Sequence, residues 1–412
     1  MFDNQFLLKR GIVFSLIWVV AITEVFSSII ENSIGSLYID SVFLVVCFCL
    51  LLTNIFLVND SSKYNIVLVG GIAVTILVSL LLGENRGFYT LLQPLFSLKY
   101  FLFYFFYEFA VKLGYLNKND LKYLLLFIFV TALLGTCLNI IMGDSFNTFL
   151  TGDARHTTEG VLRVTGFCST PGLLSFSLIL PLLFLVWDRI KKNMMSLIFF
   201  YVFCLFVFYI TDSRFSLIPM ILTFHYLLLS RFNLKYIVYP FGIILLFSIG
   251  WAMLDSATYQ RTLVNFFMTF DESNEQYIRG IMLYNSAKLS LIHFPFGAGW
   301  ATFGTLFSTD SNTYETLGIA GLRWIEEGVG IYDSYWASSI GEIGVFGLLW
   351  VLYLLKISLV PYKDRTSEKR PGEFIFILTM IYGFAYPILS HSWMSMIIVI
   401  CFFYSLNDSE ST

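Results

Sequence analysis

Long apolar stretches recur along almost the whole sequence, and they constrain the fold more than any other feature. About twelve of them are long enough to cross the hydrocarbon core of a bilayer, which takes roughly 20 mostly apolar residues in a helix. They lie near 11–30, 37–58, 65–83, 88–111, 121–143, 169–187, 194–211, 214–230, 236–254, 334–356, 374–389 and 391–406. The sequence therefore predicts an all-α, polytopic integral membrane protein with about 12 transmembrane helices.

The composition supports the same fold class. Of the 412 residues, 57% are hydrophobic and 13% are charged, and the chain contains 44 Phe and 24 Tyr. A soluble domain of this size would have too few polar residues to cover its surface. The formal net charge of −3 gives no support for a nucleic-acid partner. We predict one integral membrane domain over 1–412, with the lipid bilayer around it.

Basic residues in the short connections predict the orientation. If the N-terminus is cytoplasmic, Lys and Arg gather in the inward-facing loops, in agreement with the positive-inside rule. Those loops carry Lys63, Lys112, Lys118, Lys122, Arg189, Lys191, Lys192, Arg231, Lys235, Lys356, Lys363, Arg365, Lys369 and Arg370. An even number of spans then returns the C-terminus to the cytoplasm. One large loop, 255–332, lies outside between the ninth and tenth spans.

The outward segments carry arginine where the inward loops carry mostly lysine. Lys288 is the only lysine assigned to the outer side. The arginines there are Arg86, Arg155, Arg163, Arg214, Arg261, Arg279 and Arg323. The planar fork of arginine suits phosphate and carboxylate groups, so the set predicts an anionic ligand such as a pyrophosphate. For each single arginine, pairing with a nearby Asp or Glu is the competing interpretation.

Three of these arginines have the most informative positions. Arg214 stands at the outer edge of a span, where burying a guanidinium is costly, and Asp212 is its candidate partner. Arg163 lies shortly before another span. Arg279 lies on an amphipathic helix predicted over about 274–293, away from the apolar stripe of that helix. The stripe consists of Tyr277, Ile281, Tyr284 and Leu291. We expect this helix to cover the active site.

The chain returns to the membrane through a Gly-rich turn and a polar helix start. The turn at 295–299 (PFGAG) suits either a plain tight turn or close backbone contact with a phosphate. Asp333 stands at the predicted start of the tenth span. It suits the N-cap of that helix, and it also suits a general base directed at a sugar hydroxyl. The sequence leaves both alternatives open.

The order of these motifs resembles that of the O-antigen polymerase and O-antigen ligase superfamily of bacterial envelope glycosyltransferases. The matching motifs are Arg163-x-x-Gly166, Ser213-Arg214, Arg279 on a loop helix, Pro295-Phe296-Gly297-x-Gly299 and Glu342-x-Gly344-x-x-Gly347. The motifs lie within about 155–350, whereas the similarity in topology covers most of the chain.

The resemblance implies an inverting glycosyl transfer on the periplasmic face, without a metal or another cofactor. The donor and acceptor are glycans linked to undecaprenyl pyrophosphate. By position, Arg214 and Arg279 match the family's pyrophosphate-binding arginines, and Arg163 matches a further basic position. Ligases of this group carry a His-Asn pair where this sequence has Asp333-Ser334. The missing histidine favours a polymerase.

We therefore expect a polysaccharide polymerase of the bacterial inner membrane that joins lipid-linked repeat units into an O-antigen or a related glycan. Arg214, Arg279 and Asp333 are the expected catalytic residues, and Arg163 is expected to bind substrate. Aromatic side chains expected to stack on sugars, or to anchor the chain at the membrane interface, are Tyr284, Trp300, Tyr332, Tyr335 and Trp336.

Two alternatives and one further partner belong to this prediction. An O-antigen ligase would transfer the finished glycan to the lipid A-core. A transporter of lipid-linked oligosaccharides is the more distant alternative, because transporters place polar residues along a path through the membrane. A chain-length regulator protein is a candidate partner of the expected polymerase.

Overall fold

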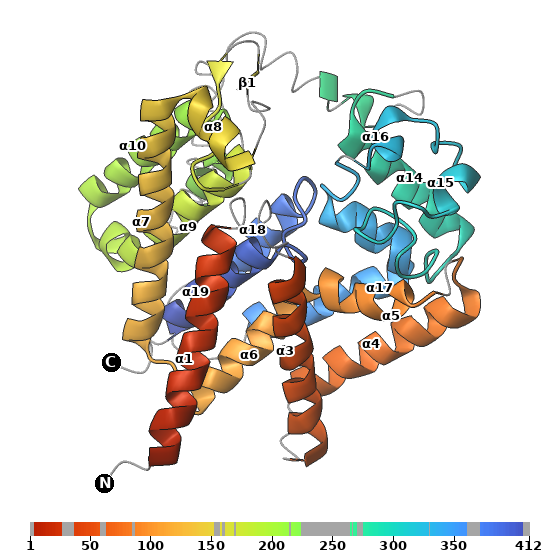
Figure 1. Cartoon of the computed structure of the whole chain (residues 1–412), viewed down its shortest axis with the longest axis horizontal. Helices are drawn as coiled ribbons and strands as arrows, with labels where there is room; N and C mark the ends of the chain where they lie inside the picture. The colour runs from red at the N-terminus through yellow and green to blue at the C-terminus, as the bar shows by residue number, and fades with distance from the viewer. Residues whose placement is uncertain are drawn as a thin grey trace, which may run out of the picture. The chain divides into compact units, whose positions relative to one another are not determined.

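The computed structural model of the chain describes residues 4–26, 37–57, 63–84, 87–151, 157–158, 161–168, 170–213, 216–223, 264–265, 267–269, 275–328, 330–360 and 371–406. Its helices are labelled in Figure 1. The chain divides into two compact units, which are described separately. Unit 1 comprises Met1–Phe43, Phe103–Ile244 and Ser392–Thr412, and unit 2 comprises Leu44–Leu102 and Leu245–His391.

The described residues are mostly helical. Unit 1 contains α1 (Asn4–Val25), α7 (Lys118–Met142), α8 (Asp144–Thr151), α9 (Pro171–Lys192), α10 (Met194–Thr211) and α19 (Ser392–Leu406). Its one short sheet is the antiparallel pairing of β1 (Thr157–Thr158) with β2 (Val161–Leu162), as far as the described residues show. Unit 2 contains α4 (Lys63–Leu82), α5 (Tyr89–Ser97), α14 (Ile278–Ile292), α15 (Thr313–Thr316), α16 (Arg323–Glu326), α17 (Tyr335–Leu359) and α18 (Pro371–Tyr382). Helices α3 (Leu37–Leu57) and α6 (Lys99–Lys112) contribute residues to both units.

Five of the described helices are long and apolar enough to cross a membrane, namely α4, α7, α9, α10 and α17. Shorter apolar helices occur at Val42–Ile55, Pro371–Tyr382 and Ser392–Leu406. These helices agree with a helical membrane protein and coincide with predicted spans. The predicted spans 214–230 and 236–254 lie largely outside the described residues. The count of twelve and the outward side of the 255–332 loop stay predictions.

The stretch 88–111, predicted as one span, forms two helices instead. Helix α5 ends at Ser97 and α6 begins at Lys99. Pro94 lies inside α5 and lacks the amide hydrogen that a continuous helix would use. The weakened helix ends one turn later, where the amide of Leu98 donates to the carbonyl of Pro94 at 3.0 Å.

In unit 1, α9 is the central helix, because it contacts α7, α10 and α19. Buried polar contacts join these elements. The side-chain oxygen of Asn139 accepts the backbone amides of Thr165 and Gly166 at 2.9 and 3.2 Å. The indole of Trp393 donates to the hydroxyl of Ser177 at 2.6 Å. The segment before α9 is therefore held on α7.

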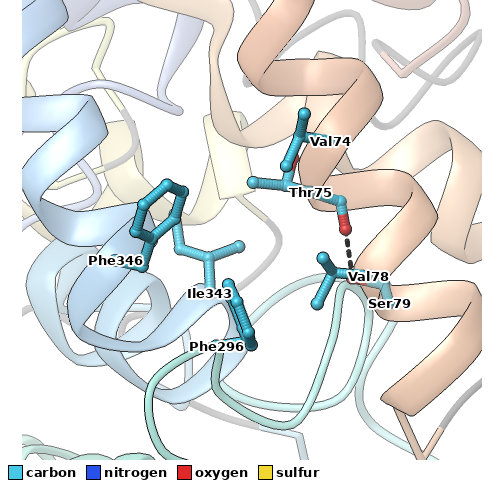
Figure 2. Close-up of a pocket in the computed structure, with 7 residues that line it drawn as sticks. All are labelled: Val74, Thr75, Val78, Ser79, Phe296, Ile343 and Phe346. Carbon is cyan, nitrogen blue, oxygen red and sulfur yellow. Dashed lines mark hydrogen bonds between the residues drawn. The ribbon is translucent and has the colours of Figure 1, made fainter.

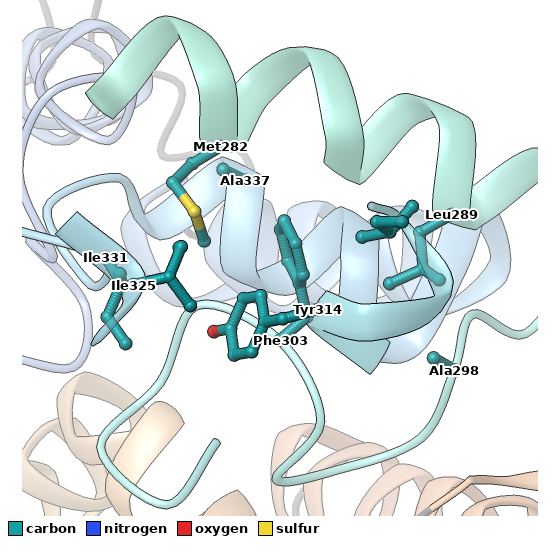
Figure 3. Packing of buried hydrophobic residues seen from close by; sticks show 9 residues of the cluster. Met282, Leu289, Ala298, Phe303, Tyr314, Ile325, Ile331 and Ala337 are labelled. Atoms are coloured by element: carbon teal, nitrogen blue, oxygen red, sulfur yellow. The ribbon is translucent and has the colours of Figure 1, made fainter. Parts of the chain in front are cut away.

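In unit 2, α14 packs along α17, and the segment between them closes over a cluster of apolar side chains that we call the loop core (Figure 3). The loop core consists of Met282, Leu289, Ala298, Phe303, Tyr314, Leu317, Ile325, Ile331 and Ala337. Burial raises the pKa of Tyr314 to about 12, and its hydroxyl accepts the amide of Gly304 at 2.9 Å. The described part of the polar insertion is thus a packed structure that can hold side chains in place.

Helix α17 is interrupted at Gly344, whose φ of 63° and ψ of −163° are not helical. An interruption leaves backbone groups without helical partners, which is costly in apolar surroundings. The Gly-rich turn at 295–299 supplies new partners. Two of its amides donate to carbonyls of α17, from Ala298 to Gly341 at 2.9 Å and from Gly299 to Glu342 at 2.8 Å.

The turn and the interrupted helix approach too closely for side chains. A Cβ on Gly297 would lie 2.5 Å from the amide nitrogen of Gly344 and 2.7 Å from the carbonyl oxygen of Glu342. Both glycines have positive φ. We call this close approach of the two backbones the Gly297–Gly344 crossing. Of the two alternatives for the turn at 295–299, the structure has the tight turn packed on α17. The amides of Ala298 and Gly299 donate to carbonyls of that helix and are not open to a phosphate.

Candidate functional site

Arg279 and Asp333 lie side by side in unit 2, although 54 positions separate them in the sequence. The Nε and Nη2 groups of Arg279 both donate to Oδ2 of Asp333, at 3.2 and 3.0 Å. The two side chains are 28% and 34% exposed, so a ligand can reach the pair from the protein surface. The structure therefore joins two of the three predicted catalytic residues.

The position of Asp333 is set by a turn and a helix cap. Its amide donates to the carbonyl of Gly330 at 3.2 Å, and Gly330 has the positive φ that this turn requires. The N-cap of α17 is Ser334, whose hydroxyl accepts the amide of Ala337 at 3.2 Å. Of the two alternatives for Asp333, the N-cap is therefore wrong. Because the hydroxyl of Ser334 caps the helix, the Asp333 carboxylate is left for an ion pair.

Arg279 lies in the first turn of α14, where the helix dipole disfavours a cation. The helix begins at Ile278, after the predicted start near 274, so Glu275 precedes it and its first turn has no acidic residue. Asp333 supplies the opposite charge. Burial lowers the pKa of Arg279, but the Asp333 carboxylate and the nearby phenols of Tyr386 and Tyr277 outweigh this and raise it overall. Arg279 is therefore a permanent cation.

The buried face of α14 differs in part from the predicted stripe. Ile281 is buried as expected, whereas Leu291 is 76% exposed. Met282 and Leu289 are buried instead, because α17 and the loop core lie against that side. Arg279 lies outside this buried set, and it was predicted to lie off the apolar stripe.

Tyr386 adds a third side chain to the pair, and sequence reasoning missed it. The guanidinium carbon of Arg279 lies 5.6 Å from the centre of the Tyr386 ring. This distance is typical of a cation–π contact. Tyr386 lies between α18 and α19, about 50 residues after Asp333, and no local pattern relates it to either charged residue.

The start of α17 is tied to the end of α18. The amides of Tyr335 and Trp336 donate to the carbonyls of Tyr386 and Gly383, at 3.3 and 3.1 Å. The indole of Trp336 donates to the carbonyl of Met380 at 2.8 Å. These amides would be the usual anion-binding groups of a helix N-terminus. Because they are bonded to protein carbonyls, the binding capacity of this site comes from side chains.

The predicted sugar-stacking aromatics divide by burial. Trp300, Tyr335 and Trp336 are buried, so their rings pack against protein and leave no face for a sugar in this structure. Tyr332 is 44% exposed and directly precedes Asp333. Tyr284 is partly exposed on α14. Of the five predicted aromatics, Tyr332 and Tyr284 are therefore the ones accessible to a ligand.

Arg163 lies in unit 1 and binds the end of α10. Its Nη2 group donates to the carbonyl of Asp212 at 3.1 Å, and its Nε group donates to the carbonyl of Thr211 at 3.3 Å. Its Nε group also lies 3.7 Å from the Asp212 carboxylate. A cation is favourable at a helix C-terminus. Asp212, expected to pair with Arg214, is thus the partner of Arg163, and Arg214 itself lies outside the described residues.

Replacing Arg163 with alanine is expected to destabilise the protein by about 1–2 kcal/mol, because two carbonyls at the end of α10 lose a charged donor. Thermal unfolding of the purified protein in nanodiscs would measure the loss. Arg163→Lys should restore part of the lost stability. Lysine keeps the positive charge, but it lacks the planar fork with which arginine reaches all three acceptors. Unchanged melting of Arg163→Ala would contradict the structural role.

A second polar cluster lies at the other end of α14. His293 Nε2 lies 3.2 Å from Oε1 of Glu84, and the hydroxyl of Thr313 donates to Oε2 of Glu84 at 2.5 Å. Fourteen residue steps along α14 separate Arg279 from His293, a distance of about 21 Å at a rise of about 1.5 Å per residue. His293 is therefore too far away to be the base of a reaction at Arg279.

Glu342, which the sequence singled out only as part of a motif, is a buried carboxylate on α17. Its side chain is 1% exposed. Oε1 accepts the amide of Thr302 at 3.2 Å and the hydroxyl of Thr305 at 2.8 Å. Glu342 therefore attaches the segment around Phe303 of the loop core to α17. No described contact joins Glu342 to the Arg279–Asp333 pair.

A small pocket lies between α4 and the Gly297–Gly344 crossing (Figure 2). Its lining is mostly apolar and consists of Val74, Thr75, Val78, Ser79, Phe296, Ile343 and Phe346. The two hydroxyls donate within α4, from Thr75 to the carbonyl of Gly71 and from Ser79 to the carbonyl of Thr75, both at 2.8 Å. The pocket thus offers apolar contact and no charged group.

Charged, accessible and closely spaced side chains make the Arg279–Asp333–Tyr386 cluster the candidate site. Among the residues that the structure describes, no three or more His, Cys, Asp or Glu side chains are grouped in a way that would hold a metal ion. Comparison of the chain with protein-family models, with curated proteins and with solved structures finds no match.

Proposed function

We propose that the protein is a glycosyltransferase of the bacterial inner membrane that polymerises undecaprenyl-pyrophosphate-linked repeat units on the periplasmic face. The observation that carries this proposal is the Arg279–Asp333 pair. A cation suited to a leaving pyrophosphate and a carboxylate suited to an attacking hydroxyl lie 3.0 Å apart, and both are accessible. The positive-inside rule supports an outward position for this part of the chain.

Each residue of the pair has a defined part in the proposed reaction. Arg279 binds the donor pyrophosphate and stabilises its negative charge as it leaves. Asp333 accepts the proton of the acceptor hydroxyl, whose oxygen forms a bond to the anomeric carbon of the donor glycan. The bond from that carbon to the pyrophosphate oxygen breaks, and its electron pair leaves with the pyrophosphate. Because pyrophosphate is a good leaving group, a weak base is sufficient.

The other predicted site residues support the proposal to different degrees. Arg214 is proposed as a second pyrophosphate ligand, and only its position in the sequence supports this role. Tyr332 and Tyr284 are proposed sugar contacts, because they are accessible and Tyr332 is adjacent to the proposed base. Arg163 is better explained by its bonds to α10 than by a ligand.

Complementation of a strain that lacks the gene tests this function. Arg279→Ala should remove the ladder of long glycans and leave products of one repeat unit, with an activity loss of about 10²–10³. Arg279→Lys should restore part of the ladder, because it keeps the charge without the fork. Arg323→Ala is the matched control, since Arg323 is an exposed arginine of the same unit paired with Glu327 at 2.9 Å.

The same experiment separates the alternatives. A full-length ladder from Arg279→Ala would rule out the role proposed for Arg279. Long chains that are not attached to a lipid core in the null strain would indicate a ligase. If purified protein elongates lipid-linked repeat units without any ion gradient, a transporter is excluded.

A further inference from the structure

The Arg279–Asp333 pair creates a conflict within the proposed reaction. The Oδ2 atom of Asp333 accepts two N–H donors from Arg279, so its lone pairs are occupied. The same two donors form the edge of the guanidinium that would bind a phosphate in a bidentate manner. A pyrophosphate cannot bind this edge while the pair is closed, and Oδ2 of Asp333 cannot accept a further proton donor. Bidentate binding of the donor at this edge therefore requires the pair to open.

The surroundings of the pair allow it to open. Both side chains are partly exposed, at 28% and 34%, and pairs of this kind contribute little to stability. Asp333 stays in place without Arg279, because its turn is closed by Gly330 and the next residue, Ser334, caps α17. A pyrophosphate carries more negative charge than one carboxylate and competes well for the same donors.

Tyr386 provides a surface that does not depend on Asp333. Its ring lies 5.6 Å from the guanidinium carbon of Arg279, and its carbonyl is bonded to the amide of Tyr335. Helix α14 is itself held by the buried side chains of Ile281 and Met282. Arg279 thus keeps two supports, its own helix and the Tyr386 ring, when the carboxylate is removed.

We propose that Arg279 exchanges Asp333 for the donor pyrophosphate, while the Tyr386 ring holds the guanidinium in both states. This inference rests on the proposed function. Donor binding then frees Oδ2 of Asp333 to accept the proton of the acceptor hydroxyl, so this oxygen becomes available only when a leaving group is in place. Tyr386 is a positioning residue in this scheme, and Asp333 is a built-in competitor of the donor.

Binding of inorganic pyrophosphate to the full chain in nanodiscs tests the exchange. Asp333→Asn removes the competing charge and should tighten binding about two- to fivefold, the range expected for breaking an exposed ion pair. If Asp333 merely positions Arg279, the same variant should bind more weakly. Equal or weaker binding by Asp333→Asn overturns the exchange. Asp333→Ser, also uncharged, serves as the second variant if the Asn protein does not fold.

Two controls separate exchange from a general charge effect. Glu327→Gln removes one carboxylate from the exposed pair with Arg323 and should leave pyrophosphate binding unchanged. In an Arg279→Ala background, Asp333→Asn should give no gain in affinity. Tightening by Glu327→Gln, or a gain without Arg279, would contradict the proposal.

The role of Tyr386 is tested in the Asp333→Asn background. Tyr386→Phe keeps the ring face and should bind pyrophosphate within about twofold of its parent. Tyr386→Leu should bind about two- to fivefold more weakly, the loss expected for an exposed cation–π contact. Equal affinity of the Leu and Phe variants would overturn the role of the ring.

The results distinguish failure of the exchange from failure of the proposed function. If the wild-type protein binds neither inorganic nor undecaprenyl pyrophosphate, and Arg279→Ala still makes a full ladder, the proposed function and the exchange fall together. If the wild-type protein binds pyrophosphate through Arg279 but Asp333→Asn weakens binding, only the exchange is wrong.

Discussion

Replacing Gly344 with alanine is expected to destabilise unit 2 by at least about 3 kcal/mol, an estimate that adds backbone strain to steric overlap. The φ of 63° and ψ of −163° at this position belong to a region that is essentially restricted to glycine. A Cβ would also overlap the amide nitrogen of Gly297 and the carbonyl oxygen of Pro295. Both are backbone atoms, so no side-chain rotation can relieve the contact.

Thermal unfolding and the yield of purified protein would measure this effect. Gly318→Ala is the matched control, because Gly318 has a φ of 74° but nothing within 4 Å of its would-be Cβ. It should lose only about 1 kcal/mol, from the unfavourable backbone conformation alone. Equal melting temperatures for the two variants would show that the Gly297–Gly344 crossing is not closely packed.

The second large effect is expected at Glu342. Glu342→Ala should destabilise the protein by about 3–5 kcal/mol, because it leaves a cavity and removes the acceptor of two buried donors. These donors are the amide of Thr302 and the hydroxyl of Thr305. Hydrogen exchange should rise across residues 300–305, where the loop core loses its attachment to α17.

Glu342→Gln is the conservative control, because it changes the carboxylate to an amide and keeps the packing. Glutamine has nearly the same shape and keeps an oxygen acceptor, so we expect a loss of about 1 kcal/mol or less. If the Gln and Ala variants melt at the same temperature, neither the packing of this side chain nor its two bonds to the loop stabilises the protein.

Both predictions concern the geometry of the candidate site, although neither residue contacts it. The Gly297–Gly344 crossing joins the end of α14 to the middle of α17, and the bonds of Glu342 attach the loop core to the same helix. Arg279 and Asp333 stand at the starts of these two helices. Loosening either attachment should therefore reduce the proposed polymerisation together with stability.

Hydropathy alone determined where α4, α7, α9, α10 and α17 run, to within a few residues. These segments need about 20 consecutive apolar residues, and that requirement is local in the sequence. Arg279 was recognised from its place off the predicted apolar stripe and from the order of the motifs, which are also local features. Its position in the first turn of α14, where a cation needs compensation from outside the helix, became clear only in the structure. The Gly-rich turn and the Glu342-x-Gly344-x-x-Gly347 motif marked Gly297 and Gly344 separately, but not as partners.

The pairings themselves were decided by the tertiary structure. Asp333 and Ser334 are both good N-cap residues, and only the position of the Ser334 hydroxyl over the first turn of α17 assigned the cap. Asp212 stood closest in sequence to Arg214, yet it pairs with Arg163, because the chain before α9 folds back onto the end of α10.

The sequence by itself determined the helical membrane class, the candidate arginines and the carboxylate. Tertiary structure alone brought Arg279, Asp333 and Tyr386 together from three separate parts of the chain. The physical reason is the distance along the sequence over which each interaction acts. Apolar length, helix dipoles and caps act within a few residues, whereas an ion pair and a ring contact form only after α14, α17 and the end of α18 have packed.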